Sequence, residues 1–296
     1  MPQLRLPIIG SSSGANPAEG VLSAAFATAG LDVAIERWEP RPYRLPDVIS
    51  ELRSGAFLGA LVAAPYKERA ATVVTAHSEN ARVTGALNGV AREGASRLRG
   101  HNTDVDGVRA GLIAILPRVQ AKWPRSAMVL GAGGGARAVV AVLITSGFQR
   151  IAVFNRRLHK AEAVVTHFAR TAQHIELRAR PWHETVLEAE LGRSRLVVNA
   201  SGVGVDEERE PSPLQPEWLP ENLFLLDLVL HPESTPLMRD VEERGGTVAN
   251  GQTSFLTAHA AIFTIWTRRE APMDEMRVAL TAELGIADAP AGIVDG

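Results

Sequence analysis

The chain has 296 residues, of which 46% are hydrophobic and 22% are charged, a balance typical of a globular protein with one large domain or two ordinary ones. Its formal net charge of -2 comes from acidic and basic residues mixed along the whole sequence, so we expect no nucleic-acid partner and no attraction to an anionic membrane. The chain contains no cysteine, which excludes disulfides, iron–sulfur clusters and thiolate zinc sites.

The first residues, MPQLRLPIIGSSSG, have no basic region ahead of a long apolar segment. Nowhere does the sequence contain roughly eighteen apolar residues in a row, the length that a membrane-spanning helix needs. We therefore expect a cytoplasmic protein without a membrane span.

The first third of the chain alternates short β-rich runs with longer helical patterns. This alternation predicts an α/β sheet with crossover helices. Strands are expected at 4–10, 32–40 and 60–65, and helices at 17–30 and 47–55.

Residues 101–107, HNTDVDG, mimic the start of an EF-hand calcium loop, because Asn102, Asp104 and Asp106 alternate before a glycine. The bidentate carboxylate expected at the twelfth position of such a loop would fall on Ile113, which lies in an apolar run. We therefore set the calcium interpretation aside.

The same segment has two other interpretations. Thr103 or Asp104 is expected to cap a helix at 105–116, because short polar side chains accept hydrogen bonds from the free amides of a first turn. Asp104 could also take part in catalysis, a question that this stretch alone leaves open.

Residues 122–147 contain an apolar strand that runs directly into a glycine cluster and then into a long apolar helix. Gly131 permits a tight turn, Gly133 lets the backbone approach a pyrophosphate, and Ala136 lets the helix pack on the strand. The helix N-terminus then offers amide donors to phosphates. A purely structural glycine turn is the alternative, but the order strand, loop, helix, strand favours a dinucleotide site. The predicted contacts from this loop are Gly131, Gly133, Gly134, Gly135 and Ala136.

The next strand, expected at 151–155, ends in Asn155, Arg156 and Arg157. A NAD-specific protein would carry a carboxylate here to hold the ribose 2′-hydroxyl, whereas a guanidinium pairs with a 2′-phosphate and stacks on adenine. The loop therefore indicates NADP as the cofactor, with two exposed arginines on a turn as the alternative.

More strand candidates follow, and two helical patterns come after them. Together with the strands at 127–130 and 151–155 they predict a second, open parallel sheet, and we place a domain boundary near residue 120. The later strands are expected at 177–182, 195–200, 223–230 and 246–251, and the helices at 253–269 and 273–285.

Taken together, these motifs resemble the shikimate dehydrogenase family. The C-terminal half carries GAGGGAR, NRR, VVNASGVG and DLVLHPESTPL, and the N-terminal half carries PYK, GALN and GHNTDVDG, all in the family's order. The resemblance covers nearly the whole chain and implies an α/β fold with two domains. An N-terminal α/β substrate domain is expected over 1–105, completed by C-terminal helices at about 253–296. A doubly wound, Rossmann-type NADP-binding domain is expected over 120–250.

By that resemblance, Lys67 and Asp104 are the catalytic pair in the cleft between the domains. Position alone would make Lys67 a solvated lysine after a proline. Hydride transfer between an alcohol and a nicotinamide requires the hydroxyl proton to leave or to arrive, and a lysine held by a carboxylate in a partly dry cleft can do both. Asn88 and Asn102 are expected to bond substrate hydroxyls. The family motifs imply further cofactor contacts from Asn199, Ala200, Ser201 and Gly251.

The sequence departs from the family pattern where the substrate is held. The polar residues usual in the pocket are replaced by Asn16, Ala18, Leu61, Ala63, Leu230 and Ala258. Asn16, and Ser13 if the loop of Ser11, Ser12 and Ser13 slides, are the predicted substitutes for the lost serine pair. His259 follows Ala258, but a helical neighbour points about 100° away, so we expect His259 to pack or to face solvent. Each lost donor costs about 1–3 kcal/mol, so we expect poor turnover of shikimate and a less polar substrate.

The sequence thus predicts an NADP-dependent alcohol dehydrogenase or ketone reductase of shikimate dehydrogenase type, acting on a small cyclic hydroxy compound as a monomer or homodimer. The resemblance also implies a place in aromatic amino acid biosynthesis. One alternative is a non-catalytic protein that senses NADP(H) or a metabolite, which the altered substrate loop favours and Lys67 and Asp104 disfavour. Another is a Rossmann enzyme of other chemistry, such as a methylene-folate-type dehydrogenase, which would leave the motif order unexplained.

Overall fold

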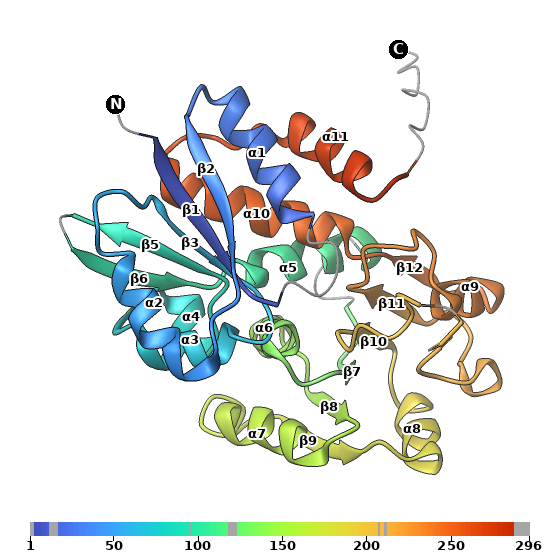
Figure 1. The fold of residues 1–296 in the computed structure, drawn as a ribbon. Coiled ribbons are helices and arrows are strands. Elements are labelled where there is room, and N and C mark those ends of the chain that lie inside the picture. Colours follow the sequence, from blue (N-terminus) through green and yellow to red (C-terminus); the bar gives the residue numbers. More distant parts are fainter. Residues whose placement is uncertain are drawn as a thin grey trace.

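The structure is a computed structural model that describes residues 3–11, 17–94, 96–117, 123–206, 208–209 and 212–286. The described residues form two six-stranded sheets, one from the N-terminal third of the chain and one from the segment after residue 125. Helices cover both faces of each sheet (Figure 1). The architecture is therefore the predicted α/β fold with two domains.

The first sheet is mixed, with the strand order β2-β1-β3-β5-β6-β4. Its first three strands pair in parallel through crossover helices, whereas β5 pairs antiparallel with both β3 and β6. The strands are β1 (Leu4–Ile9), β2 (Val33–Trp38), β3 (Gly59–Val62), β4 (Ala76–His77), β5 (Gly89–Glu93) and β6 (Arg97–His101). The helices between them are α1 (Ala18–Thr28), α2 (Leu45–Glu51), α3 (Lys67–Val73) and α4 (Glu79–Thr84).

The second sheet is parallel throughout, with the strand order β12-β11-β10-β7-β8-β9. The order reverses at β7, so the crevice of a doubly wound sheet opens at the carboxyl ends of β7 and β10. The strands are β7 (Ser126–Leu130), β8 (Arg150–Asn155), β9 (Glu176–Pro181), β10 (Leu196–Asn199), β11 (Phe224–Asp227) and β12 (Thr247–Ala249). Its helices are α6 (Gly134–Thr145), α7 (Leu158–Phe168), α8 (Glu184–Leu191) and α9 (Pro236–Glu243).

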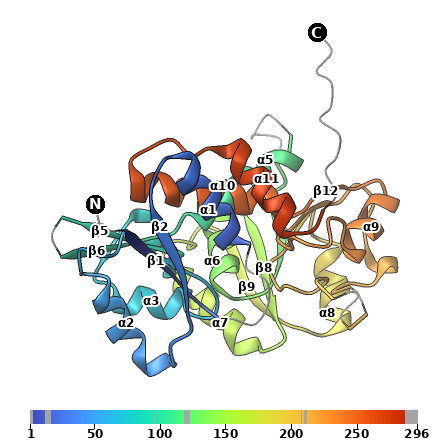
Figure 2. The same ribbon diagram turned by 45° about the horizontal axis from the view of Figure 1, so that its top comes forward.

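Two C-terminal helices return to the first sheet after the second sheet is complete. Helix α10 (Gln252–Thr267) and helix α11 (Met273–Glu283) pack with α1 over one face of that sheet, as the turned view in Figure 2 shows. Their apolar side chains join the core of the first sheet, where the rings of Phe26 and Phe263 have centroids 5.4 Å apart. The first domain is thus built from both ends of the described chain.

Helix α5 (Asp104–Ile115) joins the two halves. It begins directly after β6 of the first sheet, while its buried face, which includes Val108 and Leu112, belongs to the core of the second sheet. Its first residue, Asp104, therefore lies between the two domains.

Most predicted elements are present with shifts of a few residues at their ends, and two features differ from the predictions. The antiparallel hairpin of β5 and β6 was not predicted. Thr103 occupies the N-cap position of α5, but neither it nor Asp104 caps the helix by a side-chain hydrogen bond. The predicted boundary near residue 120 falls within 118–122, outside the described residues. Among the described helices, none is long and apolar enough to span a membrane.

Candidate active site

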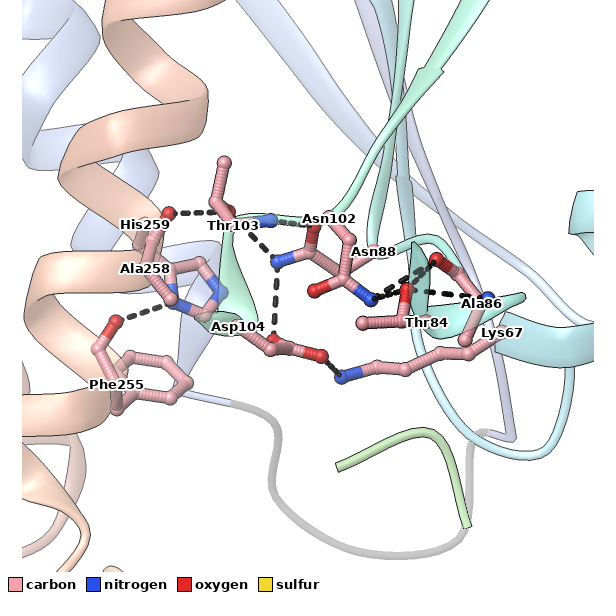
Figure 3. A network of polar contacts seen from close by, with 10 residues as sticks. All are labelled: Lys67, Thr84, Ala86, Asn88, Asn102, Thr103, Asp104, Phe255, Ala258 and His259. Carbon is pink, nitrogen blue, oxygen red and sulfur yellow. Dashed lines mark hydrogen bonds and ion pairs between the residues drawn. The ribbon is translucent and has the colours of Figure 1, made fainter. Parts of the chain in front are cut away.

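Lys67 and Asp104 meet in an ion pair at the junction of the two domains (Figure 3). The Nζ atom of Lys67 donates to Oδ2 of Asp104 at 2.6 Å, and the side chains are 22% and 17% exposed. Lys67 is the first residue of α3, which follows β3, and Asp104 is the first residue of α5, which follows β6. Both side chains thus start at helix N-termini on neighbouring parts of the first sheet, and the two residues predicted as a pair are in contact.

Asn88 fixes the orientation of the Asp104 carboxylate. Its Nδ2 group donates to Oδ1 of Asp104 at 3.1 Å and to the hydroxyl of Thr103 at 2.8 Å, while its Oδ1 accepts from the Thr103 amide. The Thr103 hydroxyl donates in turn to the carbonyl oxygen of Ala258 on α10. Asn88 is 3% exposed, so its present contacts orient Asp104, and the predicted contact with substrate stays a prediction.

Asn102 holds the turn next to this network. The residue is 1% exposed, and its amide donates to the Thr84 hydroxyl at 3.0 Å and to the Ala86 carbonyl at 2.9 Å. These contacts join the end of β6 to the turn after α4. Asn102 is therefore placed to support the turn that carries Asn88, and its predicted contact with a substrate hydroxyl stays a prediction.

The glycine cluster forms the predicted turn between β7 and α6. Gly131 has a φ of +110°, a conformation that favours glycine, and its amide donates to the carbonyl of Phe154 on β8. Ala136 is fully buried against the sheet. A β-carbon added at Gly133 or Gly135 would meet no atom within 4 Å, so space remains in front of the first turn of α6. This open helix N-terminus fits the pyrophosphate of a dinucleotide.

The loop after β8 borders a cavity of about 540 Å³. Asn155 accepts a hydrogen bond from the amide of Arg157, which shapes the turn, and both arginines of the loop have exposed side chains. Arg156, which is predicted to bind the 2′-phosphate, lines this cavity, and Lys67 does not. Its lining comprises Arg156, Trp182, His183, Glu184, Leu187, Val203, Ser212, Pro213, Gln215 and Trp218. A purine ribose fits this volume and aromatic lining, so the residues present are compatible with NADP.

Asn199 is fully buried and binds Asp227 of β11 at 2.9 Å and the Val203 carbonyl at 3.0 Å. Its Oδ1 accepts from both the amide and the hydroxyl of Ser201. Burial raises the pKa of the Asp227 carboxyl, and the groups that donate to it act in the opposite direction. Asn199 therefore shapes the turn after β10, while Ser201 remains partly exposed. The cofactor contacts predicted for both residues stay predictions.

Two further predicted cofactor residues stand at turns. The amide of Ala200 donates to the Leu130 carbonyl at 2.7 Å, directly beside the tight turn at Gly131. Gly251 is the N-cap residue of α10, and its amide donates to the Val229 carbonyl. Both lie at the carboxyl ends of strands in the second sheet, where a nucleotide is expected to bind.

Of the six residues that replace the family's usual polar groups, five are described, and none of these five has a polar side-chain atom. Leu61 is 3% exposed and packs in the core of the first sheet, Ala18 and Ala258 are buried, and Ala63 and Leu230 are partly exposed. Asn16 and Ser13, the predicted substitutes, lie outside the described residues. The predicted binding site for the substrate's carboxylate therefore lies outside the described residues.

His259 was expected to pack or to face solvent, and it packs. Its Nδ1 atom lies 2.8 Å from the Phe255 carbonyl oxygen, and its ring is stacked on the Phe255 ring with centroids 3.9 Å apart. Burial lowers the pKa of His259 to about 4. The sequence reasoning missed that the ring lies beside Asp104, although the four-residue spacing of Phe255 and His259 on one helix face was visible.

The domains also touch beneath the ion pair. Arg137 of α6 donates to the Thr84 carbonyl at 3.2 Å, and burial lowers the pKa of its guanidinium. The Nε2 atom of His167 on α7 lies 2.8 Å from the Val83 carbonyl oxygen. Within the described ranges, no group of three or more His, Asp or Glu residues could hold a metal ion. Helix α5 also runs through the segment that mimics a calcium loop.

Family profiles and curated relatives that match this chain all carry the same family description. A family profile described as shikimate dehydrogenase substrate binding domain matches residues 14–90, and one described as shikimate / quinate 5-dehydrogenase matches residues 118–189. A protein named shikimate dehydrogenase (NADP(+)) from Symbiobacterium thermophilum is 30% identical over 280 residues, which are 94% of this chain and 94% of that protein. Its counterpart from Nitrobacter hamburgensis is 36% identical over 83% of this chain and 82% of its own length.

The solved structures agree. Shikimate 5-dehydrogenase from Thermus thermophilus, crystallised in complex with NADP(H) and shikimate, superposes with a TM-score of 0.78 at 31% identity. The match covers 95% of this chain and 100% of that chain.

Proposed function

This chain belongs to the shikimate dehydrogenase family, and from that premise we propose that Lys67 and Asp104 are its proton-handling unit. The protein is an NADP-dependent oxidoreductase that transfers hydride between NADP(H) and a secondary alcohol or its ketone. The observation that carries the proposal is the ion pair of 2.6 Å at the junction of the two domains, beside the glycine turn.

The chemistry divides between the two halves of the molecule. NADP, when bound, would supply the hydride acceptor for oxidation of the carbinol carbon, and in its reduced form the hydride for the reverse reaction. Lys67, when its amino group is neutral, takes the hydroxyl proton as the alcohol becomes a ketone, and gives it back in the reverse direction. Asp104 holds the amino group in place and stabilises it once it is protonated, and Asn88 keeps the carboxylate oriented.

The cofactor side rests on the second sheet. The turn at 131–136 and the first amides of α6 would hold the pyrophosphate, and Arg156 and Arg157 would hold the 2′-phosphate. The cavity beside Arg156 would hold the adenosine. The remaining predicted contacts are Asn155, Asn199, Ala200, Ser201 and Gly251.

The substrate we propose is a cyclic hydroxy compound that is less polar than shikimate. Leu61, Ala63 and Ala258 have no side-chain donor, and leaving the hydroxyls of a polyol without partners in a closed site weakens its binding strongly. Shikimate should therefore be a poor substrate.

The proposed domains follow the two cores. Residues 1–105 with about 253–296 form the substrate domain, and 120–250 form the NADP-binding domain. The core that unites α1 with α10 and α11 supports this division. The cytoplasmic location and the choice between monomer and homodimer stay predictions.

A non-catalytic sensor of NADP(H) on this fold is the weaker alternative, because a sensor has no need of a lysine and a carboxylate in hydrogen-bond contact at the cleft. The test is NADPH formation from NADP+ with shikimate, quinate and cyclohexane-1,2-diol. Oxidation of at least one alcohol is expected, with kcat/KM for shikimate below about 10⁴ M⁻¹s⁻¹. Binding of NADP without oxidation of any alcohol in a broad panel would favour the sensor.

A further inference from the structure

Arg137 of α6 reaches from the cofactor domain to two parts of the substrate domain. Its Nη1 group donates to the Thr84 carbonyl at 3.2 Å, and its Nε atom lies 4.0 Å from Oε1 of Glu68. The side chain is 13% exposed, so the guanidinium lies between the domains and not on the surface. Gly134, three residues earlier on the same helix face, lies against the Lys67 side chain. Helix α6 thus meets the substrate domain at two points, one turn apart.

Both contacts of Arg137 lead to the proposed proton-handling unit. Glu68 directly follows Lys67 in the first turn of α3. Thr84 ends α4 at the start of the turn that leads to Asn88, and Asn88 orients the carboxylate of the unit. A change in the position of the guanidinium would therefore shift both partners of the unit relative to α6.

The guanidinium of Arg137 is not fully bonded. Its Nε group is buried, and no described residue accepts a hydrogen bond from it. Burial lowers the pKa of Arg137, and the charge of Glu68 acts in the opposite direction. A buried donor without an acceptor is costly, and the carboxylate of Glu68 is about 1 Å too far away to accept. The buried donor therefore attracts Glu68 and draws α3 toward α6.

A second residue of the cofactor domain holds the same end of α4. The Nε2 atom of His167 on α7 lies 2.8 Å from the Val83 carbonyl oxygen, and a β-carbon added at Gly85 would lie 2.5 Å from Cε1 of the ring. The last carbonyls of a helix have no partner within the helix and carry the negative end of its dipole, so N–H donors bind them well. The end of α4 is thereby fixed relative to both α6 and α7.

We propose that Arg137 is a positioning residue for hydride transfer. By binding Thr84 and Glu68, its guanidinium sets the distance between the glycine turn of α6 and the Lys67–Asp104 pair. Hydride transfer requires the reacting atoms to be held within about 3–3.5 Å of each other, so a small change in this distance has a large effect on the rate. The inference rests on the proposed function and adds a residue of the cofactor domain to it.

The kinetic test measures the single-turnover rate of NADPH formation in Arg137→Met, with saturating NADP+ and the alcohol that the wild type oxidises best. Methionine keeps the aliphatic stem and removes the guanidinium. The rate should fall at least about tenfold, because a shift of about 1 Å costs about a hundredfold, and the NADPH dissociation constant should stay within about threefold. Deuterium at the carbinol carbon should slow the variant further, which identifies hydride transfer as the affected step. A loss confined to NADPH affinity would overturn the proposal.

Arg150 provides a matched control inside the cofactor domain. Its guanidinium is 21% exposed and binds Glu190 at 2.7 Å and Glu176 at 3.4 Å, but it lies at the amino end of β8, at the opposite edge of the sheet from the glycine turn. Arg150→Met should lower the melting temperature and leave the single-turnover rate within about threefold of the wild type. Equal losses of rate in Arg137→Met and Arg150→Met would overturn the proposal. Arg137→Lys keeps a charged donor for the Thr84 carbonyl and should recover part of the lost rate.

A second measurement does not depend on turnover. The chain contains no cysteine, so two introduced thiols can carry spin labels without background. Ser50→Cys on α2 and Ala163→Cys on α7 place the labels at exposed positions of the two domains. In the NADP-bound protein, double electron–electron resonance should give a broader distance distribution for Arg137→Met than for the labelled parent or for Arg150→Met.

Equal distributions in the labelled parent and in Arg137→Met would overturn the inference, whatever the rates are. A broader distribution in Arg137→Met, in a protein whose turnover does not depend on Lys67, would instead uphold the domain contact and refute the proposed function. The two measurements therefore separate a failure of the inference from a failure of the function on which it rests.

Discussion

Lys67 lies directly against Gly134, the first residue of α6: a β-carbon added to Gly134 would lie 2.8 Å from the β-carbon and from the δ-carbon of Lys67. The aliphatic stem of the proposed catalytic lysine therefore packs on the turn that is proposed to hold the cofactor's pyrophosphate. The amino group at the end of the same side chain is bound to Asp104. One residue thus touches the second domain with its stem and carries at its tip the amino group that is proposed to exchange the proton.

Gly134→Ala should disrupt this contact. The new methyl group has to displace the Lys67 stem, since real β-carbon contacts at 2.8 Å do not occur, and a shift of about 1 Å in a reacting group costs about a hundredfold in rate. We expect kcat/KM to fall by at least about tenfold, as measured by NADPH formation with the best alcohol.

Gly192→Ala is the control for that substitution. It adds the same methyl group at the end of α8, where the nearest atoms lie 3.7 and 3.9 Å away, and it stands outside the turn that is proposed to hold the cofactor. If both variants lost activity equally, the contact with Lys67 would not be the cause.

Arg156→Ala should weaken the preference for NADP(H). A charge-assisted contact with the 2′-phosphate contributes about 1.5–3 kcal/mol, so NADP(H) should bind at least about tenfold more tightly than NAD(H), and the variant should lose most of this difference. Calorimetric titration of both cofactors measures it. Arg195→Ala, at the exposed amino-terminal end of β10, is the control and should keep the preference. A preference that survives in Arg156→Ala would assign the 2′-phosphate to other residues.

Lowering the pH should reduce the free energy of unfolding, and part of this loss should come from His259. Its pKa is lowered from 6.5 to about 4 in the folded state, so between these values the unfolded chain binds a proton that the folded chain does not. The free energy of unfolding should therefore decrease as the pH falls from about 6.5 to about 4, by up to about 3 kcal/mol from this residue. Above about pH 6.5 the contribution is complete.

Urea unfolding of the wild type and of His259→Phe across that pH range checks this. Carboxylates that titrate in both proteins cancel in the comparison, so the wild type should lose more stability than the variant. Parallel pH profiles would show that His259 can be protonated in the fold at little cost.

The cofactor half of the molecule follows closely from local sequence. A strand that ends in glycine turns sharply because Gly131 can take a positive φ, and the small residues after it permit a helix to start against the sheet. Strands β7, β8 and β10 of the second sheet are short, largely apolar runs bounded by turn residues. Such signals lie within a few residues of one another, so they can be predicted from the order of residue types.

The substrate half depends on contacts between distant segments, which local patterns do not encode. The sequence predicts that Thr103 caps a helix. In the structure its hydroxyl instead donates to the carbonyl of Ala258, 155 residues away, and accepts from Asn88. The sequence predicts that Asn102 binds substrate, and in the structure its amide donates hydrogen bonds to the Thr84 hydroxyl and the Ala86 carbonyl. The hairpin of β5 and β6 was missed because the run from 89 to 101 carries three arginines and little apolar alternation.

The most direct test of the account measures kcat for the wild type, Lys67→Met, Asp104→Asn and the double variant, with the NADPH dissociation constant of each. Methionine keeps the aliphatic stem that packs on Gly134, and asparagine keeps the shape of Asp104, so both variants should bind NADPH within about threefold of the wild type. Each single substitution should lower kcat at least about a hundredfold, and the double variant should be little worse than either, because groups that act as a unit give non-additive losses. Near-normal turnover in Lys67→Met, or losses that multiply in the double variant, would contradict the assignment of Lys67 and Asp104 as one proton-handling unit.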